Sequence, residues 1–94
     1  MLDIQVGAEG TIRLVGRFDA SQADKAEPIF KSIRMSAVAD FTELDYISSA
    51  GIAIIVETYK RLLDAGHTFR LVNLNPRIRT VFGYAGLDKV MQID

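Results

Sequence analysis

The sequence lacks cysteine and tryptophan, and its 94 residues include one histidine and two prolines. Without cysteine, neither a disulfide nor a thiolate metal site can support the fold. The longest apolar run, Gly51 to Val56, is far too short to span a lipid bilayer. We therefore expect a protein without direct membrane insertion and without a thiolate metal centre.

Charge of one sign is not in excess either, because 11 lysines and arginines oppose 12 aspartates and glutamates. A net charge of −1 with scattered basic residues argues against a nucleic-acid binder that depends on phosphate contacts. The opening residues MLDIQV carry an acid at the third position and do not resemble a signal peptide, which predicts a cytoplasmic protein. Since neither a repeat nor a linker is present, we expect one domain over residues 1–94.

Short stretches of apolar residues predict the strands. Alternating apolar residues indicate a β-hairpin over residues 2–7 and 11–16, joined by the turn sequence GAEG. AVADF, residues 37–41, is typical of a short buried strand and is followed by a connecting segment. HTFRLVNL, residues 67–74, predicts another strand, and KVMQI, residues 89–93, predicts a final edge strand.

A first helix is expected between the hairpin and the third strand, with its end near Met35. Its start is open, because Ser21 with Asp24 and Asp24 with Glu27 are both plausible capping pairs. Pro28 favours the later start, since proline is tolerated in the first turn of a helix and disrupts the interior.

Two further helices follow from apolar periodicity and from their end signals. The longer covers residues 48–65, ends at Gly66, and has an inward face made of Ile52, Ile55, Val56, Tyr59, Leu62 and Leu63. The other is capped by Asn75, has Pro76 at its first position and ends at Gly86. Its buried stripe consists of Ile78, Val81, Phe82 and Ala85. Alternating strands and helices predict an α/β fold with a small mixed β-sheet and packed helices.

Two adjacent serines, Ser48 and Ser49, stand at the start of the longer helix, just before Gly51. The first N–H groups of a helix lack partners and the helix dipole is positive there, so a phosphate on Ser49 would meet donors. Gly51 has no side chain, which would let an anion approach these amides. A helix cap is the simpler interpretation of a serine here, but one cap needs only one serine. One hydroxyl is therefore free for another purpose.

A second set of residues on the same helix recurs at helical spacing, away from the inward face. These residues are Ala50, Ala53, Ile54 and Glu57. Small side chains around an exposed isoleucine, beside a displayed serine, would form a flat docking surface for another protein. The alternative, that Ile54 contacts a neighbouring element of the same fold, is equally favoured by the sequence.

Three segments together resemble the anti-sigma factor antagonist type of STAS domain: GRFDAS, DFTELDYISSAGI and VNLNPRIRTVFGYAGL. The resemblance extends from the hairpin to Ile93, and the predicted elements follow the order of that family. It implies a protein-binding switch rather than an enzyme, with no cofactor and no metal. In such proteins an anti-sigma factor that is also a serine kinase phosphorylates a serine at this helix start. The unphosphorylated form binds that partner, and a PP2C-type phosphatase resets the cycle.

The resemblance assigns roles to single residues. Ser49 occupies the position of the phosphoacceptor, with Ser48 as the fallback acceptor, and Ala50 and Gly51 follow it. Ser48 stands where the family usually has aspartate, and Ala50 where it usually has a second serine or threonine. Asp19 matches an acidic position near the phosphoserine, where it would bond the acceptor hydroxyl or cap the loop. From the residues alone, an aspartate turn before the first helix is the favoured role of Asp19.

Enzymatic alternatives find little support in the sequence. A serine hydrolase needs a histidine within reach of its serine. His67 lies beyond the helix that Ser49 begins, roughly 25 Å away at 1.5 Å per residue. GAEG and GYAG match neither a P-loop nor a dinucleotide-binding fingerprint. We therefore expect no enzymatic activity.

Other non-enzymatic possibilities stay open. Asp19, Asp40 and Asp45 have irregular spacing and make a weak metal site, so none is predicted. The substitution of the usual aspartate by Ser48 also fits a STAS subunit of a lipid-transport ABC system, or a scaffold, that is never phosphorylated. A purely structural interaction domain is the third possibility. We expect a monomer, because no additional long apolar face is left over.

Overall fold

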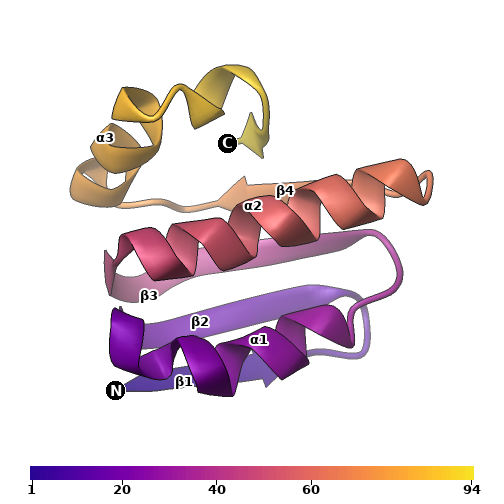
Figure 1. Ribbon diagram of the computed structural model, residues 1–94, viewed down its shortest axis with the longest axis horizontal. Coiled ribbons are helices and arrows are strands. Elements are labelled where there is room, and N and C mark those ends of the chain that lie inside the picture. The colour runs from indigo at the N-terminus through magenta and orange to yellow at the C-terminus, as the bar shows by residue number, and fades with distance from the viewer.

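Strands and helices alternate along the chain in the computed structural model, which describes residues 1–94 (Figure 1). The strands are β1 (Leu2–Val6), β2 (Thr11–Phe18), β3 (Ala37–Ile47), β4 (Phe69–Val72) and β5 (Gln92–Ile93). The α-helices are α1 (Ala23–Lys31), α2 (Ser49–Asp64) and α3 (Pro76–Tyr84), and two short 3₁₀ helices are η1 (Ala20–Gln22) and η2 (Leu87–Lys89). The predicted α/β class is confirmed.

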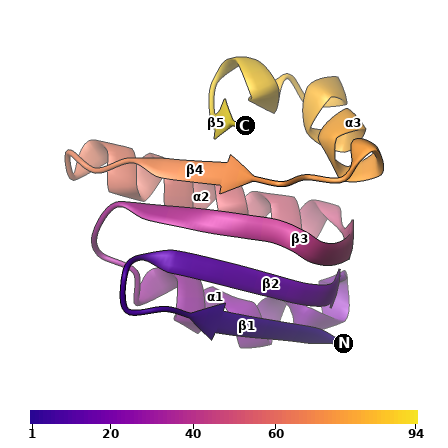
Figure 2. The ribbon, with the colours of Figure 1, turned by 180° about the vertical axis from the view of Figure 1, so that it is seen from behind.

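The five strands form one sheet in the order β1-β2-β3-β4-β5. β1 and β2 are the predicted antiparallel hairpin, and all other neighbouring pairs are parallel, so the sheet is mixed. Helices α1 and α2 cover one face, and the opposite face is in front in Figure 2. Parallel strands place their carboxyl ends at one edge, which is where β2 and β3 lead into η1 and α2.

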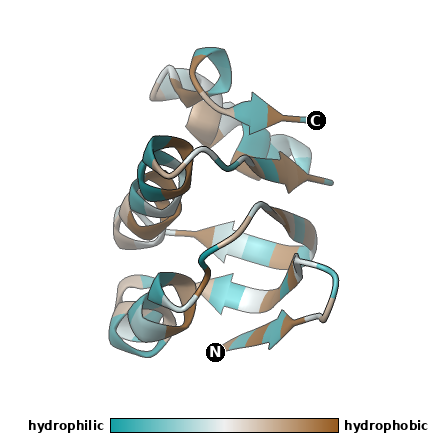
Figure 3. Ribbon diagram, turned by 90° about the vertical axis from the view of Figure 1, so that its right-hand side faces the viewer, coloured by the Kyte–Doolittle hydropathy of each residue, from teal (hydrophilic) through white to brown (hydrophobic).

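The core lies between the sheet and the helices. It contains stacked rings of Phe18 and Phe30 at a centroid distance of 6.3 Å, and tilted rings of Phe41 and Phe82 at 6.2 Å. Figure 3 shows the two layers from the side, with the helices on one side of the sheet. Each fully buried side chain of this size contributes about 1.5–3 kcal/mol to folding, so these rings fix how α1 and α3 pack on the strands.

Helix α1 differs from its prediction at both ends. The helical segment begins earlier than predicted, with η1 directly before α1. Asp19, not Ser21 or Asp24, caps η1 by accepting the Ser21 N–H. Pro28 therefore lies inside the helix rather than in its first turn, on the exposed side. The helix ends at Lys31 and not near Met35.

Strand β3 is more than twice as long as the predicted strand over residues 37–41, because residues 42–47 continue it. Its pairing with β2 shifts register twice, between Arg13 and Val15 and between Gly16 and Arg17. These irregularities break the alternation of buried residues after Phe41, which hides the strand from a period-two pattern.

Some predicted core positions of α2 and α3 are exposed. Leu63, Val81 and Ala85 belong to the predicted buried stripes, but each is exposed to solvent. Helix α3 buries only Ile78 and Phe82. The predicted end signal at Gly86 is confirmed, since this residue adopts a left-handed conformation directly after the helix. No helix combines the length and apolar content that crossing a bilayer requires.

Candidate phosphoacceptor site and docking face

Strand β3 leads directly into α2, since the strand ends at Ile47 and the helix begins at Ser49. The backbone N–H of Ser48 donates to the carbonyl of Phe18 at the end of β2, at 2.8 Å. Because β2 and β3 run parallel, their carboxyl ends meet here. The start of α2 is thus attached to the sheet on two strands.

The two serines at this junction have different roles. Ser48 is the N-cap: its extended backbone precedes the helix, its Oγ accepts the Gly51 N–H at 3.2 Å, and its side chain is half-buried. Ser49 is the first helical residue and is exposed, and its hydroxyl forms no hydrogen bond within the protein. The prediction that one serine caps the helix and leaves the other free is confirmed, with Ser49 as the free residue.

The first turn of α2 offers free backbone donors beside this hydroxyl. Ser48 accepts both the Gly51 N–H, through Oγ, and the Ile52 N–H, through its carbonyl at 2.9 Å. The N–H groups of Ser49 and Ala50 precede the helical hydrogen-bond ladder and have no acceptor within it. The positive end of the helix dipole adds to their preference for negative charge.

Gly51 has another role than the one predicted. A Cβ at this position would lie 2.9 Å from Cγ1 of Ile47 and 3.0 Å from the Phe18 ring. Gly51 is buried, so its missing side chain allows α2 to approach the sheet rather than allowing an anion to approach the helix.

Asp19 directly follows Phe18, and the structure places it in an aspartate turn. Its Oδ1 accepts the Ser21 N–H at 3.1 Å and the Ser21 hydroxyl at 2.6 Å. The hydrogen bond from the Ser21 hydroxyl is the main cause that lowers the pKa of Asp19 below its ordinary value. No hydrogen bond joins Asp19 to either Ser48 or Ser49, so of its two predicted roles the turn is the one that the structure shows.

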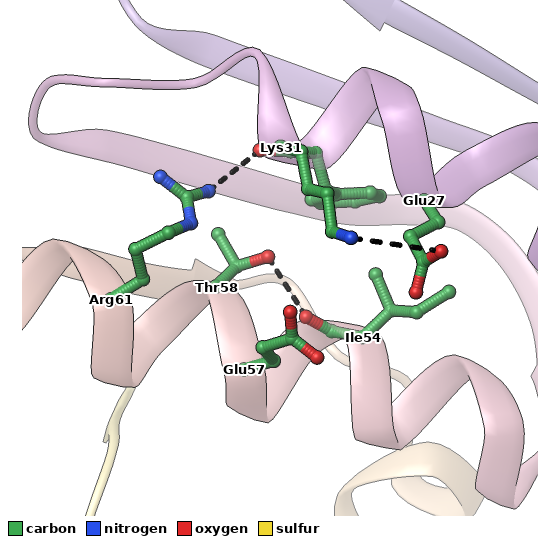
Figure 4. A pocket seen from close by; sticks show the side chains of 7 residues that line it. Glu27, Lys31, Ile54, Glu57, Thr58 and Arg61 are labelled. Atoms are coloured by element: carbon green, nitrogen blue, oxygen red, sulfur yellow. Dashed lines mark hydrogen bonds and ion pairs between the residues drawn. The ribbon is translucent and has the colours of Figure 1, made fainter.

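The expected exposure of Ile54 is wrong. Only 8% of this residue is exposed, and it lines a narrow gap between α1 and α2 with Phe30 and Thr58 (Figure 4). The alternative that the sequence left open, contact with a neighbouring element, is correct, and that element is α1. Ala53 and Glu57 are exposed and Ala50 is half-buried, so they form a surface without a central isoleucine.

A shallow groove lies beside Ser49, between α2 and η2. We call it the α2 groove, and it is lined by Ser49, Ile52, Ala53, Val56, Glu57, Lys60 and Leu87. Ile52, Val56 and Leu87 are half-buried and supply its apolar part. Apolar spacing assigns Ile52 and Val56 to the inward face of the helix, and no local pattern places Leu87 beside them. The spacing of Ile52, Val56, Tyr59 and Leu63 along one flank of α2 was the available signal.

The surroundings of Ser49 do not provide partners for hydrolysis. Helix α2 separates Ser49 from His67, and its 16 residues correspond to about 24 Å. Asp40 lies within β3, where its Oδ1 accepts from Thr42 and Asn73, and Asp45 is exposed near the end of the same strand. No three histidine or acidic side chains gather in a group that could hold a metal ion.

Comparison with known proteins agrees with this architecture. The sequence profile of the STAS domain matches residues 4–94, so the chain belongs to the STAS domain family. A curated relative from Bordetella bronchiseptica, "Putative anti-sigma factor antagonist BtrV", is 32% identical over 74 residues. That match covers 79% of this chain and 58% of BtrV, which is less than two thirds of the relative's length.

Solved structures of anti-sigma factor antagonists share the fold. SpoIIAA in its unphosphorylated form has a TM-score of 0.79 at 19% identity, over 100% of this chain and 88% of SpoIIAA. An anti-sigma factor antagonist from Mycobacterium paratuberculosis has a TM-score of 0.82 at 21% identity, over 99% and 83% of the two chains. SpoIIAA of Bacillus in its phosphorylated form also matches, with a TM-score of 0.71 at 19% identity, over 100% and 91% of the chains.

Proposed function

We propose that this protein is an anti-sigma factor antagonist whose binding to its partner is controlled by phosphorylation of Ser49. The observation that carries this proposal is the division of roles between the two serines. Ser48 is committed to capping α2, whereas Ser49 is exposed and has an unbonded hydroxyl. A kinase could therefore modify Ser49 without breaking any hydrogen bond of the fold. Ser48 is a poor phosphoacceptor, because it is half-buried and its hydroxyl oxygen caps α2.

The position of Ser49 at one end of the α2 groove supports a role in docking. The apolar side chains of Ile52, Val56 and Leu87 would meet apolar side chains of the partner, with Glu57 and Lys60 at the rim. Of the predicted docking residues, Ala50, Ala53 and Glu57 stay in the proposed docking surface. Ile54 is left out because it is buried. The partner in the proposal is a cytoplasmic anti-sigma factor with serine kinase activity.

Phosphorylation would oppose docking through charge. A phosphate adds about −1.5 to −2 charges at neutral pH, and the free amides of the first turn can hold it on this protein. A partner that covers Ser49 would have to desolvate this charge beside an apolar groove. Losing about 3 kcal/mol in this way weakens binding more than a hundredfold, which is enough for a switch. A PP2C-type phosphatase would restore the binding form.

Two substitutions at Ser49 test the switch. With an anti-sigma factor kinase from the same organism as the titrant, we expect Ser49→Ala to bind like the unmodified protein and Ser49→Asp to bind at least tenfold more weakly in calorimetry. Ser48→Asp is the matched control, because it adds the same charge at the N-cap, where aspartate is a good helix cap. Equal affinities of Ser49→Ala and Ser49→Asp would contradict the proposed mechanism.

A second function is favoured by one observation, the serine at position 48 where the family usually has aspartate. In this case the domain is an unmodified subunit of a lipid-transport ABC system or a scaffold. Mass spectrometry after incubation with ATP and the same anti-sigma factor kinase separates the two functions. Phosphate on Ser49 supports the switch, whereas a stable complex without modification supports the subunit.

A further inference from the structure

Strand β1 is the longer of the two free edges of the sheet. The strand order places β1 at one end and β5 at the other, and β5 has only two residues. Short edge strands give little for another chain to pair with, whereas β1 has five residues. The edge of β1 is therefore the place where a foreign strand could join this sheet.

Alternate residues of β1 direct their backbone groups away from β2. The carbonyl of Met1 accepts the Arg17 N–H, and the Gly7 N–H donates to the Thr11 carbonyl, each at 2.8 Å. In an antiparallel pair these hydrogen-bonded positions alternate with positions that face outward. The N–H and C=O groups of Leu2, Ile4 and Val6 therefore point to the free edge.

Asp3 is the one charged residue of this strand, and several other features that prevent edge pairing are missing. Its sequence, LDIQV, contains neither lysine nor proline, and its register with β2 runs without a bulge. Val6 is also 57% exposed, so an apolar side chain accompanies the open backbone. A regular strand of this kind is a template for pairing with an identical strand of a second copy.

Two side chains from the start of α1 occupy the outward backbone groups of Leu2. Oε1 of Gln22 accepts the Leu2 N–H at 3.1 Å, and Nζ of Lys25 donates to the Leu2 carbonyl. The Gln22 amide is oriented in turn, since its Nε2 donates to the Ser21 hydroxyl at 3.3 Å and this hydroxyl donates to Asp19. Both the donor and the acceptor that Leu2 offers at the edge are thus satisfied within the chain.

We propose that Gln22 and Lys25 form an edge clamp that prevents the β1 strands of two copies of this protein from pairing. Two antiparallel β1 strands need a run of outward residues, and the clamp removes Leu2 from that run. Only Ile4 and Val6 then remain open, which is too short a stretch for a strand pair to be stable. The clamp would leave this regular, partly apolar edge strand without the run of open backbone groups that pairing with a second copy requires.

Hydrogen exchange of the unmodified protein tests the clamp directly. The Leu2 amide should be protected by its bond to Gln22, whereas the amides of Ile4 and Val6, which have no acceptor, should exchange much faster. Gln22→Ala should bring the exchange of Leu2 to the rate of Val6. A Leu2 amide that already exchanges as fast as Val6 in the unmodified protein would overturn the proposal.

Self-association tests the consequence. We expect Gln22→Ala with Lys25→Ala to show a mass that rises toward the dimer with concentration in light scattering, while the unmodified protein and the control Lys31→Ala remain monomeric. Lys31 has the same charge on the same helix, with only a 3.9 Å exposed contact to Glu27. Thermal unfolding of each variant verifies that it is folded.

A third substitution identifies the surface responsible. Val6→Pro removes an outward N–H without removing a bond to β2, so adding it to the double variant should restore the monomer. Association that persists with Val6→Pro would place the contact elsewhere and overturn the proposal. A folded double variant that stays monomeric at every concentration, or an unmodified protein that is already dimeric, would do the same.

Discussion

At the scale of single residues, Ser48 and Ser49 show how one position along the chain changes what a hydroxyl can do. The extended backbone of Ser48 turns its Oγ back toward the Gly51 N–H, whereas Ser49 is already helical and its side chain points to solvent. A side chain that caps a helix contributes to folding and is not available for modification. The same residue type therefore stabilises the fold at one position and is displayed at the next.

Stability measurements can separate these roles without any partner. Ser48→Ala should lower the free energy of unfolding by about 1 kcal/mol, because the Gly51 N–H loses its acceptor. Ser49→Ala should change it by less than about 0.5 kcal/mol, since this hydroxyl is exposed and forms no hydrogen bond within the protein. Urea titrations of both variants provide the comparison, and equal losses would show that the two serines share the cap.

A pair of glycine substitutions tests the close approach of α2 to the sheet. Gly51→Ala should destabilise by about 1–3 kcal/mol, because the new methyl group would contact Ile47 and Phe18 too closely. Gly83→Ala in α3 is the control, since its Cβ would have no neighbour nearer than Asp88 at 3.8 Å. Alanine should stabilise that helix by up to about 1 kcal/mol. If Gly51→Ala were also stabilising in thermal unfolding, the packing argument would be wrong.

At the scale of elements, α2 is held by α1 as well as by the sheet, and this second contact accounts for two errors together. The predicted inward face of α2 ran through Leu63, whereas the observed face is rotated toward α1 and includes Ile54 and Thr58. Apolar periodicity identified the helix but could not reveal the neighbour on its flank. The spacing therefore puts Leu63 in the inward face and leaves Ile54 undecided between exposure and contact with a neighbour, whereas the structure exposes Leu63 and buries Ile54.

Other elements were predictable to the extent that their signals were local. The hairpin, the Asn75 cap and the Gly86 end depend on neighbouring residues, and the structure confirms them. The length of β3 depends on bulges opposite β2, which no local pattern of β3 encodes. For the candidate site, the cap and the free hydroxyl could be predicted from the sequence, whereas the α2 groove also depends on Leu87, which only the fold brings near.

Arg61 connects the two helices, and its replacement should loosen them. Its guanidinium donates to the carbonyls of Ile33 at 2.7 Å and Phe30 at 2.8 Å, where α1 ends. Lysine replaces the two separate nitrogens of this fork by a single one, which does not match both carbonyl positions, so Arg61→Lys should cost about 1–2 kcal/mol. The exposed Arg77, which forms no such bonds, is the control as Arg77→Lys. Equal urea midpoints for both variants would mean that the bridge adds nothing.

At the scale of the whole molecule, acid stability should reflect two aspartates. The pKa of Asp40 is lowered, first by the Thr42 hydroxyl that donates to it and then also by Asn73, and the pKa of Asp19 is lowered by the Ser21 hydroxyl. A lowered folded-state pKa favours the charged form in the fold. Each group therefore contributes stability above the unfolded-state pKa of about 3.9, and this contribution is lost as the pH falls through the lower folded-state value.

Asp40→Asn tests this dependence. The variant should lose less stability than the unmodified protein between about pH 5 and pH 2, because one titrating group that prefers the folded state is gone. Urea midpoints at a series of pH values measure the slope. The hydrogen bonds of Asp40 link β3 to the segment after β4, so a lower stability of the variant at pH 7 is expected as well. An unchanged slope would rule out Asp40 as a source of acid sensitivity.

The direct passage from β3 into α2 has a consequence for how a signal can leave this site. Only Ser48 lies between strand and helix, and it is hydrogen-bonded to both Phe18 and Gly51, so we expect the backbone at Ser49 to keep its position when the side chain is modified. The partner would then detect phosphorylation only through the changed charge and shape of the surface at Ser49, without a conformational change elsewhere. In NMR spectra, amide shifts caused by phosphorylation should fade beyond the opening turn of the helix, leaving distant resonances such as those of α3 where they were.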